Sequence, residues 1–334
     1  MTKPVIAVTI GDPAGIGPEI VLKSLMSRHV WERGVPLIVG DLSVLKAVRD
    51  RLGLKIRLNR VRDAESAFGD VREFPVFDVA RINDPSKLDV GAISELGGEA
   101  SVAYIRASVD LCKRGGVAGI ATAPINKEAL RAARFHYIGH TEMLAEMSEA
   151  EKSYTVFIVD KLRILFHSRH ISLRKAIETL DEDEIVRSLE SADRCLRSIG
   201  MTPKSIALAA LNPHASDGGL FGDEENRILI PAVARARQKG LAVTGPVPAD
   251  SVFALALQGR YDIVVSLFHD QGHIAAKTYD FYKTVSVTFG LPFLRTSVDH
   301  GTAYDIAWKG LANPVSMETA ILSCYDLAPK YRWK

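Results

Sequence analysis

The chain has 334 residues, of which 47% are hydrophobic and 25% charged; 42 Lys and Arg against 40 Asp and Glu give a formal net charge of +2. These proportions are those of an ordinary globular protein and exclude a disordered or fibrous chain. The charge balance argues against a general nucleic-acid-binding protein, and no apolar run approaches the roughly 18–20 residues that cross a bilayer.

Cysteine usage and the start of the chain indicate the cellular compartment. The three cysteines are an odd number without a CxxC pair, which is typical of a reduced protein without disulfides or a thiolate metal site. The chain begins with a short strand-like run and not with a secretory segment. We therefore expect a cytoplasmic protein that contacts neither nucleic acid nor membrane.

Short apolar runs that end in turn residues alternate with longer amphipathic segments. The runs predict strands at Val5–Ile10, Leu37–Val39, Val117–Ala123, Leu162–Phe166, Ile206–Leu211, Ile263–Phe268 and Val285–Phe289. The segments between them predict helices at Pro18–Arg28, Ser94–Arg114, Ser172–Ile199 and Asp223–Lys239. Because the runs are continuously apolar, they are typical of parallel strands buried on both faces, and the alternation predicts an α/β fold.

The length predicts two domains with a cleft between them, because a single hydrophobic core is near its size limit here. We expect a discontinuous first α/β domain at residues 1–130 plus 290–334. The second α/β domain is expected at residues 131–289 and would carry most of the candidate site residues. No Gly/Ser-rich linker marks either boundary.

A glycine-rich segment, Gly11–Glu19, joins the first predicted strand to the first predicted helix. Gly15 and Gly17 partly match a dinucleotide-binding fingerprint, but Ile20 stands where the third glycine belongs. A tight turn with Pro18 at the start of the helix explains the segment without a ligand. The chain also lacks a Walker A lysine motif, a G-x-S-x-G elbow and H-E-x-x-H, so kinase, serine-hydrolase and zincin functions have no support.

Three histidines follow predicted strands: His170, His214 and His269. In an open parallel sheet, ligands bind beyond the carboxyl ends of the strands, where such imidazoles can converge. Three imidazoles with open coordination positions suit a catalytic divalent metal that also holds a substrate. The alternative is three separate hydrogen-bonded loop histidines.

Two aspartates lie near this set. Asp270 follows His269 directly and either orients that histidine or caps the following turn. Asp250 is either a neighbour of the metal and substrate or the N-cap of the following helix. Both are candidates for the group that takes a proton during catalysis.

A second group of candidate residues is cationic. Lys277 and Arg295 flank the predicted strand Val285–Phe289 and would suit a phosphate or carboxylate, the alternative being solvated surface charge. Gly139-His140-Thr141-Glu142 opens a predicted helix, with Thr141 as a plausible cap. Backbone N–H groups at this helix start would also suit an anion.

Seven motifs occur in order along essentially the whole chain. They are Gly11-Asp-Pro-Ala-Gly-Ile-Gly-Pro-Glu19, Ala121-Thr-Ala-Pro-Ile-Asn-Lys127, Gly139-His-Thr-Glu142, Leu211-Asn-Pro-His-Ala215, Pro248-Ala-Asp250, His269-Asp-Gln-Gly272 and Arg295-Thr-Ser-Val-Asp-His-Gly-Thr-Ala303. Together they resemble the 4-hydroxythreonine-4-phosphate dehydrogenase family of vitamin B6 biosynthesis.

The resemblance implies a fold like isocitrate and isopropylmalate dehydrogenases, with two α/β domains, a deep cleft and an obligate homodimer whose interface lies on the second domain. It implies NAD bound without the usual fingerprint, and it assigns no NAD-contacting residues.

The family's metal ligands map onto His170, His214 and His269, with His269 coming from the other subunit. His170 is chosen over His167 because the family's ligand lies three residues before the leucine of Leu173-Arg174. The family's substrate contacts map onto His140, Thr141, Lys277, Ser286 and Arg295.

Two positions depart from the biosynthetic enzymes of this family. Ser286 stands where they carry asparagine, and His273-Ile274 follow the His-Asp-Gln-Gly motif where Leu-Pro is usual. Serine offers one hydroxyl in place of an amide with separate donor and acceptor ends. This keeps open the related branch that acts on D-threonate or D-erythronate 4-phosphate and gives dihydroxyacetone phosphate and CO2.

The family's chemistry is the NAD-dependent oxidation of a secondary alcohol followed by loss of CO2, with a divalent zinc, cobalt, manganese or magnesium ion. The ion lowers the pKa of the alcohol and stabilises the enolate that remains after decarboxylation. The base stays open between Asp250, Asp270 and water. A non-redox, metal-dependent lyase acting on a phosphorylated acid is the more distant alternative.

Overall fold

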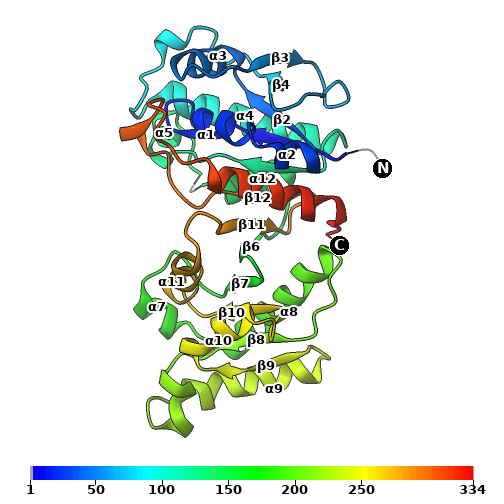
Figure 1. The fold of residues 1–334 in the computed structure, drawn as a ribbon. Coiled ribbons are helices and arrows are strands. Elements are labelled where there is room, and N and C mark those ends of the chain that lie inside the picture. Colours follow the sequence, from blue (N-terminus) through cyan, green and yellow to red (C-terminus); the bar gives the residue numbers. More distant parts are fainter. Residues whose placement is uncertain (1–2, 138, 334) are drawn as a thin grey trace. The chain divides into compact units, whose positions relative to one another are not determined.

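The structure, a computed structural model, describes residues 3–137 and 139–333 and divides them into two compact units (Figure 1). Unit 1 contains the residues up to Ser153 together with Val285–Trp333, and unit 2 contains Tyr154–Thr284. Residues 131–153 and 285–289, expected in the second domain, belong to unit 1 in this division. That either unit is an independent domain stays a prediction.

Unit 1 is built on a seven-stranded portion of sheet. Its strands, in spatial order, are β3 (Arg57–Val61), β4 (Glu73–Asp78), β2 (Val35–Gly40), β1 (Val5–Thr9), β5 (Gly119–Thr122), β12 (Leu294–Ser297) and β11 (Val285–Phe289). Neighbouring strands are parallel except β11 and β12, which are antiparallel. The central strands β1 and β5 are almost completely buried, as their continuous apolar runs predict.

Helices cover this sheet portion. They are α1 (Gly17–Ser24), α2 (Arg28–Arg33), α3 (Leu42–Arg51), α4 (Glu95–Lys113), α5 (Lys127–Ala132), α6 (His140–Ser148) and α12 (Val315–Leu327). Helices α4 and α12 both pack on β1 and β5. The Ser94 hydroxyl accepts a hydrogen bond from Gly97 N and so caps α4, in agreement with the predicted start of that helix.

Unit 2 repeats the α/β arrangement. Its strands, in spatial order, are β6 (Tyr154–Val159), β7 (Leu162–Phe166), β10 (Ile263–Ser266), β8 (Ile206–Ala209) and β9 (Val243–Val247). Strands β6 and β7 form an antiparallel hairpin, and the pairs from β7 to β9 are parallel. The helices are α7 (Leu173–Glu178), α8 (Glu182–Ser198), α9 (Ile230–Gln238), α10 (Ala249–Leu257) and α11 (His269–Tyr279). The predicted α/β class is thus confirmed.

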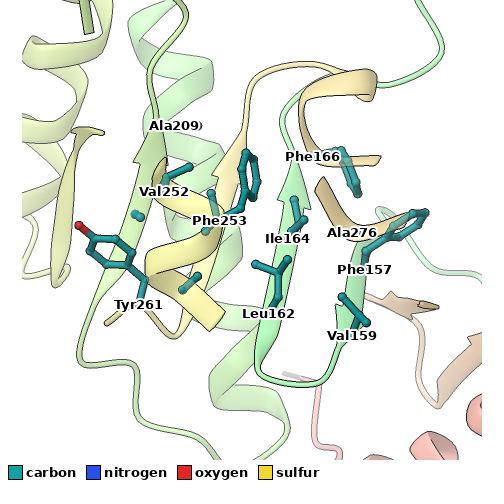
Figure 2. Packing of buried hydrophobic residues seen from close by; sticks show 13 residues of the cluster. Phe157, Val159, Leu162, Ile164, Phe166, Ala209, Val252, Phe253, Tyr261 and Ala276 are labelled. Carbon is teal, nitrogen blue, oxygen red and sulfur yellow. The ribbon is translucent and has the colours of Figure 1, made fainter. Parts of the chain in front are cut away.

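The core of unit 2 lies between its sheet and helices α10 and α11 (Figure 2). Alternate residues of β7, among them Leu162 and Ile164, face Val252 and Phe253 of α10 and Ala276 of α11. Both helices begin just after a strand, α11 after β10 and α10 after β9. This packing therefore fixes where the first turns of α10 and α11 lie.

Three predicted helices are interrupted. The predicted helix Pro18–Arg28 ends at Ser24, and a separate helix starts at Arg28. Ser172–Ile199 is two helices, because Asp181 accepts a hydrogen bond from Glu184 N and starts a new one. Asp223–Lys239 begins with a π-helical turn, η3 (Glu225–Leu229), which ends two residues before Pro231, a residue with no N–H to donate.

The glycine-rich segment is explained by packing. A side chain on Gly17 would lie 2.0 Å from the Ile10 carbonyl oxygen, and Gly11 has a φ of +66°. Pro18 stands in the first turn of α1. Within the described residues no helix combines the length and apolar character needed to cross a membrane.

Candidate functional site

The three candidate metal histidines follow three adjacent strands of unit 2. Strands β7, β10 and β8 are neighbours and parallel, so their carboxyl ends lie at one edge of the sheet. His170 follows β7, His269 opens α11 after β10, and His214 lies in the short helical segment η2 (Pro213–Gly219) after β8. The fold thus carries all three histidines at the same edge of the sheet.

Two of these histidines lie close together. The ring centroids of His170 and His269 are 6.2 Å apart, and the His273 ring stacks on His269 at 3.6 Å. His170 and His214 are exposed, and His269 is half-buried. Within residues 3–137 and 139–333 of the single chain, no group of three or more His, Cys, Asp or Glu side chains is placed to hold a metal ion. The three-histidine metal site therefore stays a prediction.

Asp270 orients His269. Its carboxylate Oδ1 lies 2.7 Å from His269 Nδ1. The ring donates from Nδ1 to this carboxylate, so the lone pair on Nε2 is left to accept a proton or bind a metal. Carboxylates commonly orient metal-binding histidines in this way.

Asp250 lies in the first turn of α10, whose N-cap is Pro248 and has no side-chain cap. The alternative that Asp250 caps this helix is therefore wrong. Asp250 and Asp270 both line a hollow of about 660 Å³ along α10 and α11. The remaining lining is mostly apolar, including Phe253, Leu257 and Ile274.

His214 starts an unusual backbone segment. The φ values of His214, Ala215, Ser216 and Asp217 are 52°, 54°, 64° and 46°. Four consecutive non-glycine residues with left-handed backbone are costly, at about 1–2 kcal/mol per residue. The surrounding structure has to hold this segment in place.

Arg295 of unit 1 is buried in a polar pocket. The residue is 5% exposed, and its Nε and Nη2 donate to Thr122 Oγ1 at 3.0 and 2.7 Å. Its Nη1 donates to Thr288 Oγ1 at 3.2 Å. Thr288 and Arg295 are paired across β11 and β12 and share one face of the sheet. The next residue of β12, Thr296, points to the opposite face, where its hydroxyl donates to Ala320 O of α12. The guanidinium thus lies on the sheet face away from α12, so the alternative of solvated surface charge is wrong for Arg295.

Burial lowers the pKa of Arg295 to about 9, and the nearby carboxylates of Asp299 and Glu142 partly oppose this shift. The group remains a cation at neutral pH. Its hydrogen-bond partners are neutral hydroxyls, so much of the charge is left for an incoming anion.

His140 is the first residue of α6, and its ring Nε2 is buried without a hydrogen-bond partner among the described residues. Burial, followed by the positive charge of Arg295, lowers the pKa of His140 well below its usual value. A buried polar atom without a partner is costly and is a position for a ligand atom. His140 and Arg295 together are suited to an anionic oxygen.

Burial of His140 predicts a pH dependence of stability. In the unfolded chain this histidine takes up a proton near pH 6.5, whereas its folded pKa is lower. Unfolding therefore takes up a proton below about pH 6.5, and the free energy of unfolding falls as the pH falls, by at most about 1.4 kcal/mol per pH unit for one group.

We expect His140→Gln to flatten this dependence, measured by urea unfolding between about pH 5 and 8. Part of the slope should remain, because burial also lowers the pKa of His167. His29→Gln, at an exposed histidine, is the control and should keep the full slope. An unchanged slope in the His140 variant would contradict the expectation.

The other predicted substrate contacts are placed as follows. Ser286 is buried and pairs with Ser297, two positions along β11 from Thr288, so it shares the sheet face of Arg295. Thr141 is the second residue of α6, but the N-cap is Gly139, so the capping role given to Thr141 is wrong. Lys277 belongs to unit 2, in the last turn of α11, with its ammonium 5.4 Å from the centre of the Phe281 ring.

Sequence reasoning missed the two threonines that hold Arg295. Thr122 lies in the Ala121–Lys127 motif, and Thr288 lies two residues after Ser286 in the same strand. Residues two apart in a strand point to the same face of the sheet. Thr288 could therefore have been predicted from Ser286, which is a candidate substrate contact in the same strand.

Comparison with known proteins gives consistent matches over the whole chain. Residues 32–324 match the PdxA family, described as pyridoxal phosphate biosynthetic protein PdxA. A protein of Clostridium botulinum (strain Hall), provisionally named D-threonate 4-phosphate dehydrogenase, is 44% identical over 330 residues, covering 99% of this chain and 98% of that protein. A relative with the same provisional name from Symbiobacterium thermophilum is 46% identical over 325 residues, covering 96% of this chain and 95% of that protein. A crystal structure of 4-hydroxythreonine-4-phosphate dehydrogenase from Klebsiella pneumoniae is 42% identical, with a TM-score of 0.89 and 98% of each chain covered.

Proposed function

The chain belongs to the PdxA family, and from this premise we propose that it oxidises and decarboxylates a four-carbon 3-hydroxy acid phosphorylated at C4, with NAD as the hydride acceptor. The relatives are named dehydrogenases, and the chain is an oxidoreductase. The single observation that carries the substrate class is the buried Arg295, whose hydrogen-bond partners among the described residues are hydroxyls, together with the buried His140 Nε2, which has no hydrogen-bond partner among them.

This observation favours a substrate with an anionic group. A guanidinium binds a carboxylate or phosphate with paired hydrogen bonds, and water exclusion strengthens them. His140, Thr141 and Ser286 belong to the same unit and would complete the contacts around Arg295. Lys277 of unit 2 would hold a second anionic group as a point charge.

The donor set in unit 2 fits a divalent ion, because His170, His214 and His269 follow adjacent strand ends and Asp270 leaves His269 Nε2 available. We assign these histidines as ligands, with His269 from a second copy of the chain. When bound, the ion would polarise the substrate oxygens at C3, and NAD would accept the hydride. Zinc, cobalt, manganese and magnesium are the candidate ions.

The chain's own residues orient the substrate and handle the proton. Oxidation removes a hydride from C3 and a proton from its hydroxyl, and the resulting β-keto acid loses CO2 to leave an enolate that takes up a proton. We assign the first proton transfer to Asp250. Asp270 is engaged by His269, whereas Asp250 lines the same hollow without such a contact to any residue that the structure describes.

The hollow along α10 and α11 also supports the proposed homodimer. Ile274 and Tyr279 are 62% and 49% exposed, and Phe253 and Leu257 line the same hollow. Large exposed apolar side chains gathered at one place are typical of an interface. A second copy seated there would bring its own first turn of α11, with His269, toward the site.

Among the candidate substrates we favour D-threonate 4-phosphate. The two relatives at 44% and 46% identity carry that name, and Ser286 stands where biosynthetic enzymes have asparagine. The other candidate is 4-phospho-hydroxythreonine, since the crystal structure at 42% identity is of an enzyme named for it. The two acids differ in a hydroxyl against an amino group at C2.

Side-by-side turnover on 4-phospho-hydroxythreonine, D-threonate 4-phosphate and D-erythronate 4-phosphate tests this assignment. We expect NADH formation to be fastest with D-threonate 4-phosphate, by about tenfold or more in kcat/KM, because one well-placed hydrogen bond is worth about 1.4 kcal/mol. Ser286→Asn should shift the ratio toward the amino acid. Product formation without NADH would identify the non-redox lyase instead.

A further inference from the structure

The loops that carry the candidate metal histidines are joined by side-chain hydrogen bonds outside the sheet ladder. The Ser168 hydroxyl, after β7, donates to Leu267 O, after β10, at 2.8 Å. Leu267 N donates to Gln271 Oε1 of α11, also at 2.8 Å. Both backbone groups of Leu267 are thus bonded to side chains, which ties the loop after β7 to the loop after β10.

The same chain of contacts continues to the loop after β8. Gln271 Nε2 donates to Ala210 O at 2.8 Å. Glu225 Oε1 accepts from Leu211 N at 2.8 Å and from Asn212 N at 2.7 Å, and its Oε2 accepts from Asn212 Nδ2 at 2.8 Å. Three consecutive residues after β8 are therefore fixed by Gln271 and Glu225.

One residue of each contact lies at the same distance in sequence from a candidate histidine. Ser168, Leu267 and Asn212 each lie two residues before a candidate ligand, namely His170, His269 and His214 in that order. A contact at this distance fixes the backbone that leads into the histidine.

Glu225 is the most costly member of this set. The residue is completely buried, and it opens the π-helical turn η3. A buried carboxylate destabilises the folded state unless hydrogen bonds compensate it, and here N–H donors of Leu211 and Asn212 do so. These bonds act directly before the left-handed segment that begins at His214, which needs support from its surroundings.

We propose that Ser168, Gln271 and Glu225 are positioning residues that hold the three histidine loops at a fixed spacing, with Gln271 as the central link. The proposal rests on the proposed function, because it takes the histidines as ligands of a divalent ion. Because His269 is assigned to the site of the second copy, Ser168 and Glu225 act on the loops of the two ligands that one copy supplies to its own site. Gln271 ties these loops to the His269 that the same copy supplies to the other site.

Gln271→Met tests the central link, because methionine has a similar volume and can form neither hydrogen bond. We expect the metal-free variant to bind Co²⁺ about 10–100-fold more weakly than the unmodified protein, measured by absorption titration. The midpoint of thermal unfolding should fall, because Leu267 N and Ala210 O are buried and lose their partner, but the variant should stay folded at the temperature of the titration. Gln238→Met, at an exposed glutamine at the end of α9, is the matched control and should bind Co²⁺ normally. Unchanged Co²⁺ affinity in Gln271→Met would overturn the proposal.

Two substitutions of Glu225 that remove its hydrogen bonds partly or completely provide a second test. Glu225→Gln keeps one oxygen for the two backbone N–H groups and should retain more Co²⁺ affinity than Glu225→Leu, which keeps none. Amide hydrogen exchange in metal-free protein should speed up at Leu267 in Gln271→Met and at Leu211 and Asn212 in Glu225→Leu. If the unmodified protein binds no Co²⁺, the proposed function fails; the exchange rates then decide on the positioning role, and unchanged rates would overturn it.

Discussion

Replacing His214 with alanine is expected to lower NADH formation by about 1,000-fold or more without unfolding the protein. The activity should fall because loss of one imidazole from a three-histidine set removes most of the stabilisation that a divalent ion gives to the oxidised intermediate, which is several kcal/mol. The fold should persist because His214 is exposed and follows β8 on a loop. Steady-state NADH absorbance and the thermal unfolding midpoint are the two measurements.

The matched control for this variant is His29→Ala. His29 is also an exposed histidine, on α2 of unit 1, and its ring lies 3.3 Å from Glu32 on the same helix. Its removal should leave turnover within about twofold of the unmodified protein, since exposed surface changes cost little. Activity of the unmodified protein that survives an excess of chelator would contradict the metal assignment.

Replacing Arg295 with methionine is expected to make the ligand-free protein more stable and to weaken substrate binding. Burial lowers the pKa of the guanidinium to about 9, which means that the folded state carries this charge at neutral pH at a cost. Methionine removes the cost, so the unfolding midpoint should rise. It also removes the paired hydrogen bonds to the substrate anion, so KM should rise by about 100-fold.

Inorganic phosphate separates these two effects. At 100 times its dissociation constant it should stabilise the unmodified protein by about 2.7 kcal/mol and leave Arg295→Met unaffected. Arg187→Met, at an exposed arginine that pairs with Glu184 on α8, should respond to phosphate as the unmodified protein does. A phosphate-dependent shift that persists in Arg295→Met would place the anion elsewhere.

Much of the fold follows from local sequence patterns. The strands Leu162–Phe166 and Val285–Phe289 begin and end as their apolar runs predict. Other strands end two residues early, as at Ile206–Ala209 and Ile263–Ser266, because the last apolar residues of those runs enter the loops that carry the histidines. Apolar character alone does not distinguish a buried loop residue from a strand residue.

The site was less predictable than the fold. The positions of His170, His214 and His269 after strands can be read from the sequence, since an apolar strand and a histidine beyond its end are local features. The burial of Arg295 and Glu225 cannot, because these residue types are mostly exposed and only tertiary hydrogen bonds make their burial tolerable. Of the two hydroxyl partners of Arg295, Thr288 lies on the adjacent strand β11, whereas Thr122 of β5 is 173 residues away in sequence.

The order in which the strands of unit 1 appear along the chain has a consequence for biosynthesis. Strand β5 pairs with β12, and all of unit 2 is encoded between them. A ribosome therefore completes the segment of unit 2 while one edge of β5 still lacks its neighbour. During translation that edge exposes unpaired N–H and C=O groups of an apolar strand, which makes the half-made chain a natural client for chaperones.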